Sequence, residues 1–466
     1  MKNVLEFLEK TAKRDGWKTA ADDGNICMTW AELWDLSMRL GSAFCHRTVP
    51  GKPVIILMDK KVITLAAMFG AVYAGCFYTV IDPWQPPLRI REIFRLLKTE
   101  IVFTDQVYEE LLKQIGYSGQ ILTLRMAIRE KTESDVLMAV RKKSRETDLL
   151  YCMFTSGSTG TPKGIVVNHK AVIDFISHFT ELFHFGTEDR IGNQAPFDFD
   201  ISVKDIYTCV FTGATLVLIP EKLFSTPPVL LDYLCEKQIN TLIWAVSALT
   251  MLSSLRGLEY RVPVDVKKVL FSGEVMPVNQ LTKWQRALPE TCFINLYGPA
   301  EITCNCTWYP VPKEVSSEES IPIGRALPGR KVFLLNDEGC VLTNNDEGET
   351  GEICVAGESL SEGYFRDPEE TKRKFRVCPE TKERFYCTGD LGCFGKDGEL
   401  YFAGRKDFQI KHMGHRIELE EIEYQIDQID GVEDSCCFLQ PKNRILTAAK
   451  VKQFFPMTVS TFFRQR

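Results

Sequence analysis

Residues 149–168 read LLYCMFTSGSTGTPKGIVVN, two β-rich runs separated by a loop of glycine, hydroxyl side chains and one lysine. The first run predicts a buried strand that enters the loop. Glycine lets backbone N–H groups turn toward an anion, hydroxyl groups add donors, and Lys163 supplies a positive charge. A flexible linker does not usually lie between two buried strands. The stretch therefore predicts a loop that holds a polyphosphate.

The residues after this loop distinguish it from a Walker loop. In a Walker loop, Ser or Thr follows the lysine and a helix begins at once. Here Gly164 follows Lys163 and leads into the strand-like IVVN. A helix is expected from about His169, with an apolar face formed by Val172, Phe175, Ile176, Phe179 and Leu182.

Strand and helix signals alternate along most of the 466 residues. β-rich runs separated by helical periodicity lie at residues 54–57, 101–103, 149–154, 215–219, 242–244 and 268–271. From about Ile323, strands punctuated by Asp-Gly turns predict a compact antiparallel region. The sequence thus predicts an α/β fold with a large multilayer N-terminal domain that includes a β-rich subdomain.

A second, small unit is expected at the carboxyl-terminal end. Ile422, Ile426 and Ile429 share one helical face that ends at Gly431. We expect a core domain over residues 1–407 and a small, shortened α+β domain over residues 408–466, which is too short to bury more than a marginal core alone. The last residues, KQFFPMTVSTFFRQR, show no clear period, so they fit either a docked strand or a truncated end.

Composition excludes several classes of function. A net charge of -6 and a pI near 5.7 argue against binding nucleic acid through phosphate neutralisation. The 16 Cys are scattered, as in a protein with free thiols, and six His without a C-x-x-C pair indicate no metal cluster. The N-terminus carries charges where a signal peptide needs an apolar core, so we expect a cytoplasmic protein.

The uncharged run at residues 63–81 is long enough to cross a bilayer. It changes at Gly75 from a helical pattern to the β-rich FYTVI. A buried helix followed by a buried strand explains this change better than a membrane span, so we expect no contact with a membrane.

Five motifs occur in a fixed order along the chain. They are TSGSTGTPKG at 155–164, NLYGPAE at 295–301, GEICVAGESLSEGYF at 351–365, YCTGD at 386–390 and GRKDFQIKHMGHRIELEEIE at 404–423. In this order they resemble the signatures of the adenylate-forming superfamily, which comprises acyl-CoA synthetases, luciferases and the adenylation domains of nonribosomal peptide synthetases. The segments APFDFDISVKDIY and FSGEVMPV most resemble amino-acid adenylation domains and D-alanyl carrier protein ligases. The similarity runs from near residue 1 to about residue 435.

The resemblance implies a reaction and the residues that carry it. The family's carboxylate substrate attacks the α-phosphate of ATP, so the protein must align and neutralise two anions. The residues that would hold ATP by resemblance are Thr155, Ser156, Gly157, Ser158, Thr159, Gly160, Lys163, Asn295, Tyr297, Gly298, Asp390 and Arg405. Among them Tyr297 would stack on adenine beside Gly298, and Asp390 would accept both ribose hydroxyls. Glu301 would hold Mg²⁺ and, with Lys163, Asp390 and Arg405, completes the expected catalytic set.

Asp200 is the residue that suggests an amino acid as the substrate. A carboxylate beside an apolar pocket needs a cation, and an α-ammonium group would supply it. The alternative is an Asp that caps a helix beginning near Ser202. By rough alignment the other pocket residues are Ile201, Lys204, Ile243, Leu270, Ser272, Leu296, Cys304 and Asn305. Lys204 fits either a polar or acidic substrate side chain or a solvated surface position.

Three features bear on activity. Ala300 stands where the family usually has a Thr whose hydroxyl reaches the α-phosphate, which removes about 1.5–3 kcal/mol of binding unless Thr303 or water replaces it. The family's catalytic Lys, in a Pro-x-x-Gly-Lys turn, has no counterpart, since Lys442, Lys450 and Lys452 lack that context. Asp407 would be the hinge of the small domain, and residues 411–416 would line a pantetheine tunnel.

The favoured interpretation is ATP-dependent activation of an amino acid, followed by transfer to the phosphopantetheine thiol of a separate carrier protein. An acyl- or aryl-CoA ligase is the second interpretation, and Asp200 argues against it. The third is an inactive, truncated nucleotide-binding fragment.

Overall fold

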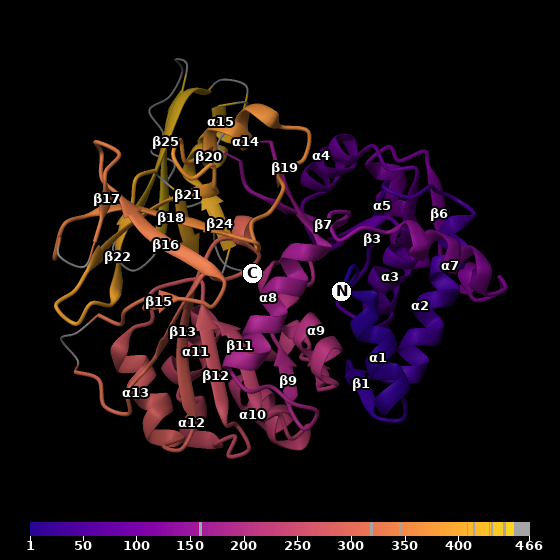
Figure 1. The fold of residues 1–466 in the computed structure, drawn as a ribbon, viewed down its shortest axis with the longest axis horizontal. Coiled ribbons are helices and arrows are strands. Elements are labelled where there is room, and N and C mark those ends of the chain that lie inside the picture. The colour runs from indigo at the N-terminus through magenta and orange to yellow at the C-terminus, as the bar shows by residue number, and fades with distance from the viewer. Residues whose placement is uncertain are drawn as a thin grey trace.

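The described part of the chain forms three large sheets with flanking helices, followed by two short hairpins (Figure 1). The computed structural model describes residues 1–157, 161–316, 320–343, 346–407, 409–412, 415–427, 429, 432–440 and 444–451. The predicted α/β class, with a β-rich region toward the carboxyl end, is confirmed.

The first sheet carries the phosphate loop. Its strands, in spatial order, are β19 (Gly363–Tyr364), β8 (Lys163–Asn168), β7 (Leu149–Thr155), β4 (Phe77–Ile81), β3 (Pro53–Leu57), β5 (Ile101–Thr104) and β6 (Gln120–Leu122). Strands β3 and β4 are parallel and buried on both faces, which explains their continuous apolar sequences. The antiparallel pair β7 and β8 flanks the predicted loop.

The second sheet supplies the other wall of the site. Its strands, in order, are β15 (Arg325–Ala326), β14 (Thr307–Pro310), β13 (Cys292–Tyr297), β12 (Lys268–Ser272), β11 (Thr241–Ala245), β9 (Arg190–Asn193), β10 (Thr215–Leu218), β1 (Thr19–Asp22) and β2 (Cys27–Thr29). Strands β13, β12, β11, β9, β10 and β1 run parallel.

The third sheet is antiparallel, as predicted for the region after Ile323. Strands β17 (Val341–Leu342), β16 (Arg330–Leu335), β18 (Gly351–Gly357), β21 (Arg384–Phe394) and β20 (Phe375–Val377) follow in order, and β22 (Leu400–Arg405) also pairs with β21. After it come the hairpins β23 (Gln409–His412) with β24 (His415–Glu418), and β25 (Val432–Gln440) with β26 (Arg444–Val451).

Helices cover the sheets. They are α1 (Leu5–Asp15), α2 (Trp30–Cys45), α3 (Val62–Tyr73), α4 (Pro87–Leu97), α5 (Glu109–Gln114), α6 (Leu124–Ala127), α7 (Ser134–Lys143), α8 (His169–Leu182), α9 (Ile201–Thr212), α10 (Pro227–Glu236), α11 (Val246–Ser254), α12 (Gly257–Tyr260), α13 (Val278–Ala287), α14 (Pro368–Lys374) and α15 (Leu419–Asp427). Short 3₁₀ turns lie at Gln106–Tyr108, Glu221–Ser225 and Ala300–Ile302. Local caps set two of the starts: Thr29 and Glu32 form a capping box on α2, and Asn168 caps α8.

The long uncharged run is a buried helix and strand, as predicted. It forms α3 and β4, whose residues are almost all buried. In the described part of the chain, no helix is long and apolar enough to cross a membrane.

The two central helices α8 and α9 lie between the first and second sheets (Figure 1). The apolar face predicted for α8 is buried, and α9 is buried along most of its length because it contacts α1, α8 and the second sheet. Gly213 ends α9 with a φ of 87°, a left-handed conformation that glycine adopts without strain. Gly213 therefore sets where α9 ends.

Candidate active site

A cavity of about 590 Å³ lies beyond the carboxyl ends of β7, β12 and β13. Ligands of open α/β sheets bind at this end of the parallel strands. The predicted site residues that line the cavity are Thr155, Ser156, Asp200, Ile201, Ser272, Gly298, Cys304, Asp390 and Arg405. The fold therefore brings part of the phosphate loop, of the expected adenosine site and of the expected acyl pocket to one cavity.

The phosphate loop begins where β7 ends. Thr155 and Ser156 line the cavity. At Gly157 a Cβ atom would lie 2.2 Å from the carbonyl oxygen of Thr161, so a larger residue would not fit without a backbone shift. Ser158, Thr159 and Gly160 lie outside the described residues.

Lys163, at the start of β8, contacts an acid that the sequence analysis did not single out. Its Nζ lies 2.9 Å from Oε1 of Glu370 on α14. Arg373 binds the same carboxylate, with Nε 2.5 Å from Oε2 and Nη2 2.6 Å from Oε1. Burial raises the pKa of Glu370, but the bonds from Arg373 and Lys163 outweigh burial and hold that pKa at about 2. A phosphate would compete with Glu370 for the lysine.

The adenosine side is built around Asp390. The Tyr297 hydroxyl donates to Asp390 Oδ2 at 2.6 Å, and Arg405 Nη1 contacts the other carboxylate oxygen. The pairing of β21 with β22 places Asp390 opposite Arg405. Arg405 also donates to Asp407 through Nε at 2.5 Å and Nη2 at 2.7 Å. Burial and the nearby Asp390 raise the pKa of Tyr297 well above its usual value, so the phenol stays a donor.

Asn295 and Gly298 have structural roles that the motif did not reveal. Asn295 donates from Nδ2 to the Pro322 carbonyl at 2.7 Å and is buried. At Gly298 a Cβ atom would lie 2.5 Å from Cα of Asn305 and 2.7 Å from the Cys304 carbonyl oxygen. The neighbouring backbone therefore requires glycine here, whether or not adenine lies beside it.

Glu301, the expected Mg²⁺ ligand, is fully buried in the short helix Ala300–Ile302. Its Oε1 accepts a hydrogen bond of 2.8 Å from the Tyr364 hydroxyl. Among the described residues no group of three or more His, Cys, Asp or Glu side chains gathers to hold a metal. One carboxylate plus phosphate oxygens suits Mg²⁺, so the donor set fits a metal that arrives with the nucleotide.

Ala300 lines the cavity, and Thr303 does not replace the missing hydroxyl. The Thr303 hydroxyl donates to the Ser359 carbonyl at 2.7 Å, and the residue is completely buried. Thr303 and Cys304 have φ angles of 56° and 75°, which non-glycine residues adopt at a cost of about 1–3 kcal/mol each. The wall beside Ala300 is thus a strained turn.

Asp200 lies at the N-cap position of α9, and it also lines the cavity. Its backbone is helical, with φ -60° and ψ -27°, and its side chain makes no capping hydrogen bond. The Cys304 thiol lies 3.1 Å from the Asp200 carbonyl oxygen. The carboxylate therefore does not act as a cap, and it lies on the wall where a substrate amine was expected.

Lys204 is buried, so the alternative of a solvated surface lysine is wrong. Only 1% of the residue is exposed. Its Nζ donates to Asn305 Oδ1 at 2.8 Å and to Ser272 Oγ at 3.3 Å, both neutral oxygens. Burial lowers the pKa of the ammonium, and the fields of nearby acids such as Asp205 oppose the shift. Lys204 was expected in the pocket wall, but it is not among the residues that line the cavity. Its ammonium group instead contacts Ser272, which does line the cavity.

Three of the expected pocket residues are core residues. Ile243, Leu270 and Leu296 are at most 2% exposed, and in the described structure they belong to the core cluster rather than to the cavity lining. They support the pocket through the strands β11, β12 and β13.

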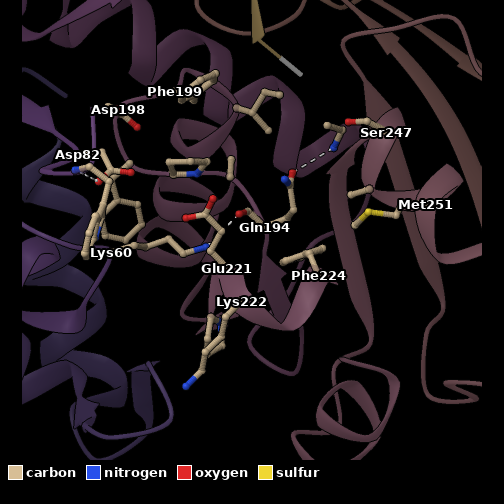
Figure 2. Close-up of a pocket in the computed structure, with 18 of the residues that line it drawn as sticks. Lys60, Asp82, Gln194, Asp198, Phe199, Glu221, Lys222, Phe224, Ser247 and Met251 are labelled. Carbon is tan, nitrogen blue, oxygen red and sulfur yellow. Dashed lines mark hydrogen bonds between the residues drawn. The ribbon is translucent and has the colours of Figure 1, made fainter. Parts of the chain in front are cut away.

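A second cavity, of about 1170 Å³, adjoins the first. Figure 2 shows its lining, with Asp82 and Asp198 on one side and Ser247 and Met251 on the opposite side. The sequence analysis did not single out Asp198, although the repeated Phe-Asp of PFDFD was a signal. Lys60 is half-buried and donates to the carbonyls of Asn193 and Gln194, and desolvation lowers its pKa to about 8.

The hairpin after Asp407 closes one side of the first cavity. Gln409, Ile417 and Glu421 line it, and Arg89 on α4 pairs with Glu421 at 3.4 Å. Gly414, Lys442, Lys452 and the tail at 452–466 lie outside the described residues, so the tunnel and the missing lysine stay predictions.

A family model described as AMP-binding enzyme matches residues 8–365. The chain belongs to the AMP-binding enzyme family. This confirms the expected class, an ATP-dependent adenylate-forming ligase. D-alanine--D-alanyl carrier protein ligase of Staphylococcus aureus (strain Newman) is 32% identical over 439 residues, 93% of this chain and 84% of the relative. Tyrocidine synthase 1 of Brevibacillus parabrevis is 30% identical over 424 residues, and the match spans 91% of this chain but 38% of that relative.

Solved structures show the same fold. The Vibrio cholerae adenylation domain AlmE, in complex with glycyl-adenosine-5'-phosphate, matches with a TM-score of 0.84 at 23% identity, over 96% of this chain and 88% of that one. NpsA-ThdA, an artificially fused adenylation-PCP di-domain from Klebsiella oxytoca, matches with a TM-score of 0.82 at 20% identity, over 97% and 89%. The predicted similarity to adenylation domains and carrier protein ligases is confirmed.

Proposed function

We propose that this ligase activates an amino acid with ATP and transfers the aminoacyl group to the phosphopantetheine thiol of a separate carrier protein. The observation that carries the proposal is the placement of Asp200 in the same cavity as Thr155, Ser156 and Asp390. A carboxylate on the wall opposite a phosphate loop suits a substrate that has an amine next to its own carboxylate.

ATP would lie across the cavity. The Thr155 and Ser156 hydroxyls and the backbone of the loop would donate to the phosphates, and Lys163 would move from Glu370 to a phosphate oxygen. Asp390 would accept the ribose hydroxyls, held in place by Tyr297 and Arg405. Mg²⁺ held by Glu301 would neutralise phosphate charge as the carboxylate approaches the α-phosphate. These residues orient and neutralise, and none of them forms a covalent bond with the substrate.

The amine of the substrate would pair with Asp200. A half-buried carboxylate is stabilised most by a cation that donates a hydrogen bond to it directly. The ammonium group of Lys204, behind Ser272, favours a substrate side chain with an oxygen acceptor, since the field of a buried cation is poorly screened. The relatives named for D-alanine and glycyl-adenosine-5'-phosphate support an amino acid as the substrate.

The carrier would be a separate protein. The relative named a D-alanyl carrier protein ligase and the structure described as an adenylation-PCP fusion support a carrier protein as the acceptor. The aminoacyl adenylate would form first, and the carrier thiol would then displace AMP.

Pyrophosphate exchange across a panel of amino, fatty and aryl acids tests this proposal. Exchange is expected with one or a few amino acids, most strongly with those that carry a side-chain oxygen. Asp200→Ala should reduce this exchange at least about 100-fold, because it removes the charged partner of the amine, while ATP still binds. Exchange with fatty or aryl acids alone would contradict the proposal.

A further inference from the structure

Two cavities adjoin along a shared wall. The nucleotide cavity of about 590 Å³ and the second cavity of about 1170 Å³ share part of their lining, which includes Pro196, Asp198, Phe199 and Ile201 from one loop. The other shared lining residues are Asp82, Trp84, Glu221 and Ile417. A thiol that attacks an acyl adenylate cannot enter through the space that the nucleotide fills. The second cavity is therefore the approach that the described structure offers to such a thiol.

Asp198 occupies this wall with one carboxylate oxygen unsatisfied. Its Oδ2 accepts a hydrogen bond of 2.6 Å from Gln85 Nε2. Its Oδ1 is buried and has no hydrogen-bond partner among the described residues, and the same is true of Gln85 Oε1. A buried acceptor without a donor is destabilising, so a ligand that brings a proton donor would stabilise the site.

Asp198 and Asp200 are close together in the chain, and this closeness limits which substrate groups Asp198 can reach. Phe199 alone separates the two residues in the chain, and Asp198 lines both cavities. In the proposed function Asp200 holds the α-amine, which is two bonds from the acyl carbon. Asp198 lies two residues before Asp200 in the chain and also lines the second cavity, from which a thiol would approach.

We propose that Asp198 is the general base that takes the proton from the attacking thiol when the thioester forms. The inference rests on the proposed function. As the sulfur–carbon bond forms, the S–H proton passes to Asp198 Oδ1. The bond between the acyl carbon and the phosphate oxygen breaks, and its electron pair leaves with AMP. The aminoacyl thioester and AMP are the products, so atoms and charge balance without another reactant.

The charged neighbours of Asp198 make it a stronger base than an exposed aspartate. Burial and the nearby Asp82 raise the pKa of Asp198 to about 6. Glu221 lines the same two cavities, and Lys60 lines the second cavity. On the nucleotide side the charged groups are Arg89 of α4, Glu421 of α15, Arg405, Asp390 and Asp200. With a pKa of about 6, Asp198 is mostly ionised at neutral pH and still accepts a thiol proton.

The experiment separates the two half-reactions. The chemically prepared adenylate of the amino acid that supports pyrophosphate exchange is mixed with the full chain and with pantetheine as the thiol, and thioester formation is followed in single turnovers. Asp198→Asn keeps the shape of the side chain, and its amide can donate to Gln85 Oε1, so the variant should fold. It is expected to transfer about 100-fold more slowly at pH 7, the usual contribution of a general base. Pyrophosphate exchange with the wild-type amino acid should stay within about threefold.

The pH profile distinguishes a base from a structural residue. In the wild type the transfer rate should rise with pH up to about 6 and then level off until the thiol itself ionises at alkaline pH. In Asp198→Asn the rate should rise without a plateau up to the pKa of the thiol, so the two proteins converge at high pH. Asp82→Asn is the matched control, because it removes a second carboxylate that lines both cavities. The transfer rate of Asp82→Asn should still reach a plateau, and this plateau should begin at a pH below 6.

Each outcome has one meaning. Equal transfer rates and profiles for the wild type and Asp198→Asn would overturn the inference and leave the proposed function intact. A wild type that forms no thioester faster than the uncatalysed reaction would overturn the proposed function, and the inference with it. Loss of exchange as well as transfer in Asp198→Asn would show that Asp198 acts in adenylation and would also overturn the inference.

Discussion

Ala300 shows how one missing hydroxyl affects the whole site. It lines the nucleotide cavity directly before Glu301, and the hydroxyl of Thr303 is already bonded to the Ser359 carbonyl. Thr303 therefore does not replace the donor that the resemblance places at position 300. A donor here would face the α-phosphate only when the substrate is bound, so its loss affects catalysis more than folding.

Ala300→Thr should therefore raise activity. One hydrogen bond to a charged phosphate oxygen contributes about 1.5–3 kcal/mol, which corresponds to roughly a ten- to hundredfold higher rate of pyrophosphate exchange. Ala300→Val, which has the same shape without the hydroxyl, is the control and should give no increase. Equal rates for the two variants would show that the hydroxyl does not contact the reacting phosphate.

Residues also show what the sequence could and could not predict. Motif spacing predicted that Asp200, Asp390 and Arg405 belong to one site, and in the structure all three line the same cavity, where strands and a helix start hold them. It did not reveal that Lys204 is buried, because a lysine in an amphipathic helix is usually exposed. The role of Asp198 could not be predicted from the sequence. Its carboxylate oxygen lacks a hydrogen-bond partner because of how the side chains pack, and sequence periodicity carries no information on this packing.

At the scale of elements, α14 couples the phosphate loop to the third sheet. Asp367 caps it by accepting from the Glu370 backbone N–H at 3.0 Å, and Glu370 then binds Lys163. The sequence indicated the strands on both sides of this helix. It did not indicate that an acid of this helix neutralises the expected phosphate lysine, because the two are far apart in the chain.

Glu370→Gln should free Lys163 for ATP. The glutamine keeps a hydrogen bond but removes the negative charge that competes with phosphate, so the dissociation constant of ATP should fall about fivefold, or roughly 1 kcal/mol. Isothermal titration with ATP measures this change. Glu369→Gln removes an exposed charge from the same helix and should leave the affinity unchanged. Weaker ATP binding in Glu370→Gln would mean that the carboxylate positions the lysine instead of competing for it.

Over the whole molecule, the two large mixed sheets create the site where their parallel strands end, and helices α8 and α9 hold the sheets together (Figure 1). Alternating strand and helix signals predicted this class of fold because buried parallel strands have continuous apolar sequences. The order of strands within the sheets could not be predicted, since it depends on long-range pairing that local patterns do not encode.

The N-terminus is attached to this body through a buried histidine, which predicts a pH dependence of stability. The Val4 backbone N–H lies 3.4 Å from His169 Nδ1, and Asn3 Nδ2 lies 3.2 Å from Nε2. Burial and the nearby Arg141 lower the pKa of His169 from 6.5 to about 3. Between these values the unfolded chain binds a proton that the folded chain excludes. The free energy of unfolding should therefore fall by about 1.4 kcal/mol per pH unit as the pH drops below 6.5.

His169→Gln should remove this part of the pH dependence. Urea unfolding at pH 7 and pH 5 is the measurement, and between these values the wild type should lose about 2 kcal/mol more than the variant. His184→Gln changes another histidine, one whose backbone has a positive φ of 51°, and serves as the control that should keep the wild-type slope. The same loss in wild type and His169→Gln would show that other groups cause the pH dependence.

A crystal structure with alanyl sulfamoyl adenosine, a stable mimic of an aminoacyl adenylate, tests the central claim most directly. We predict the ribose hydroxyls on Asp390, the sulfamoyl group beside Thr155 and Ser156, and the amine within hydrogen-bond distance of the Asp200 carboxylate. A ligand bound elsewhere, or an amine that contacts no carboxylate while Asp200 points away from it, would contradict the account.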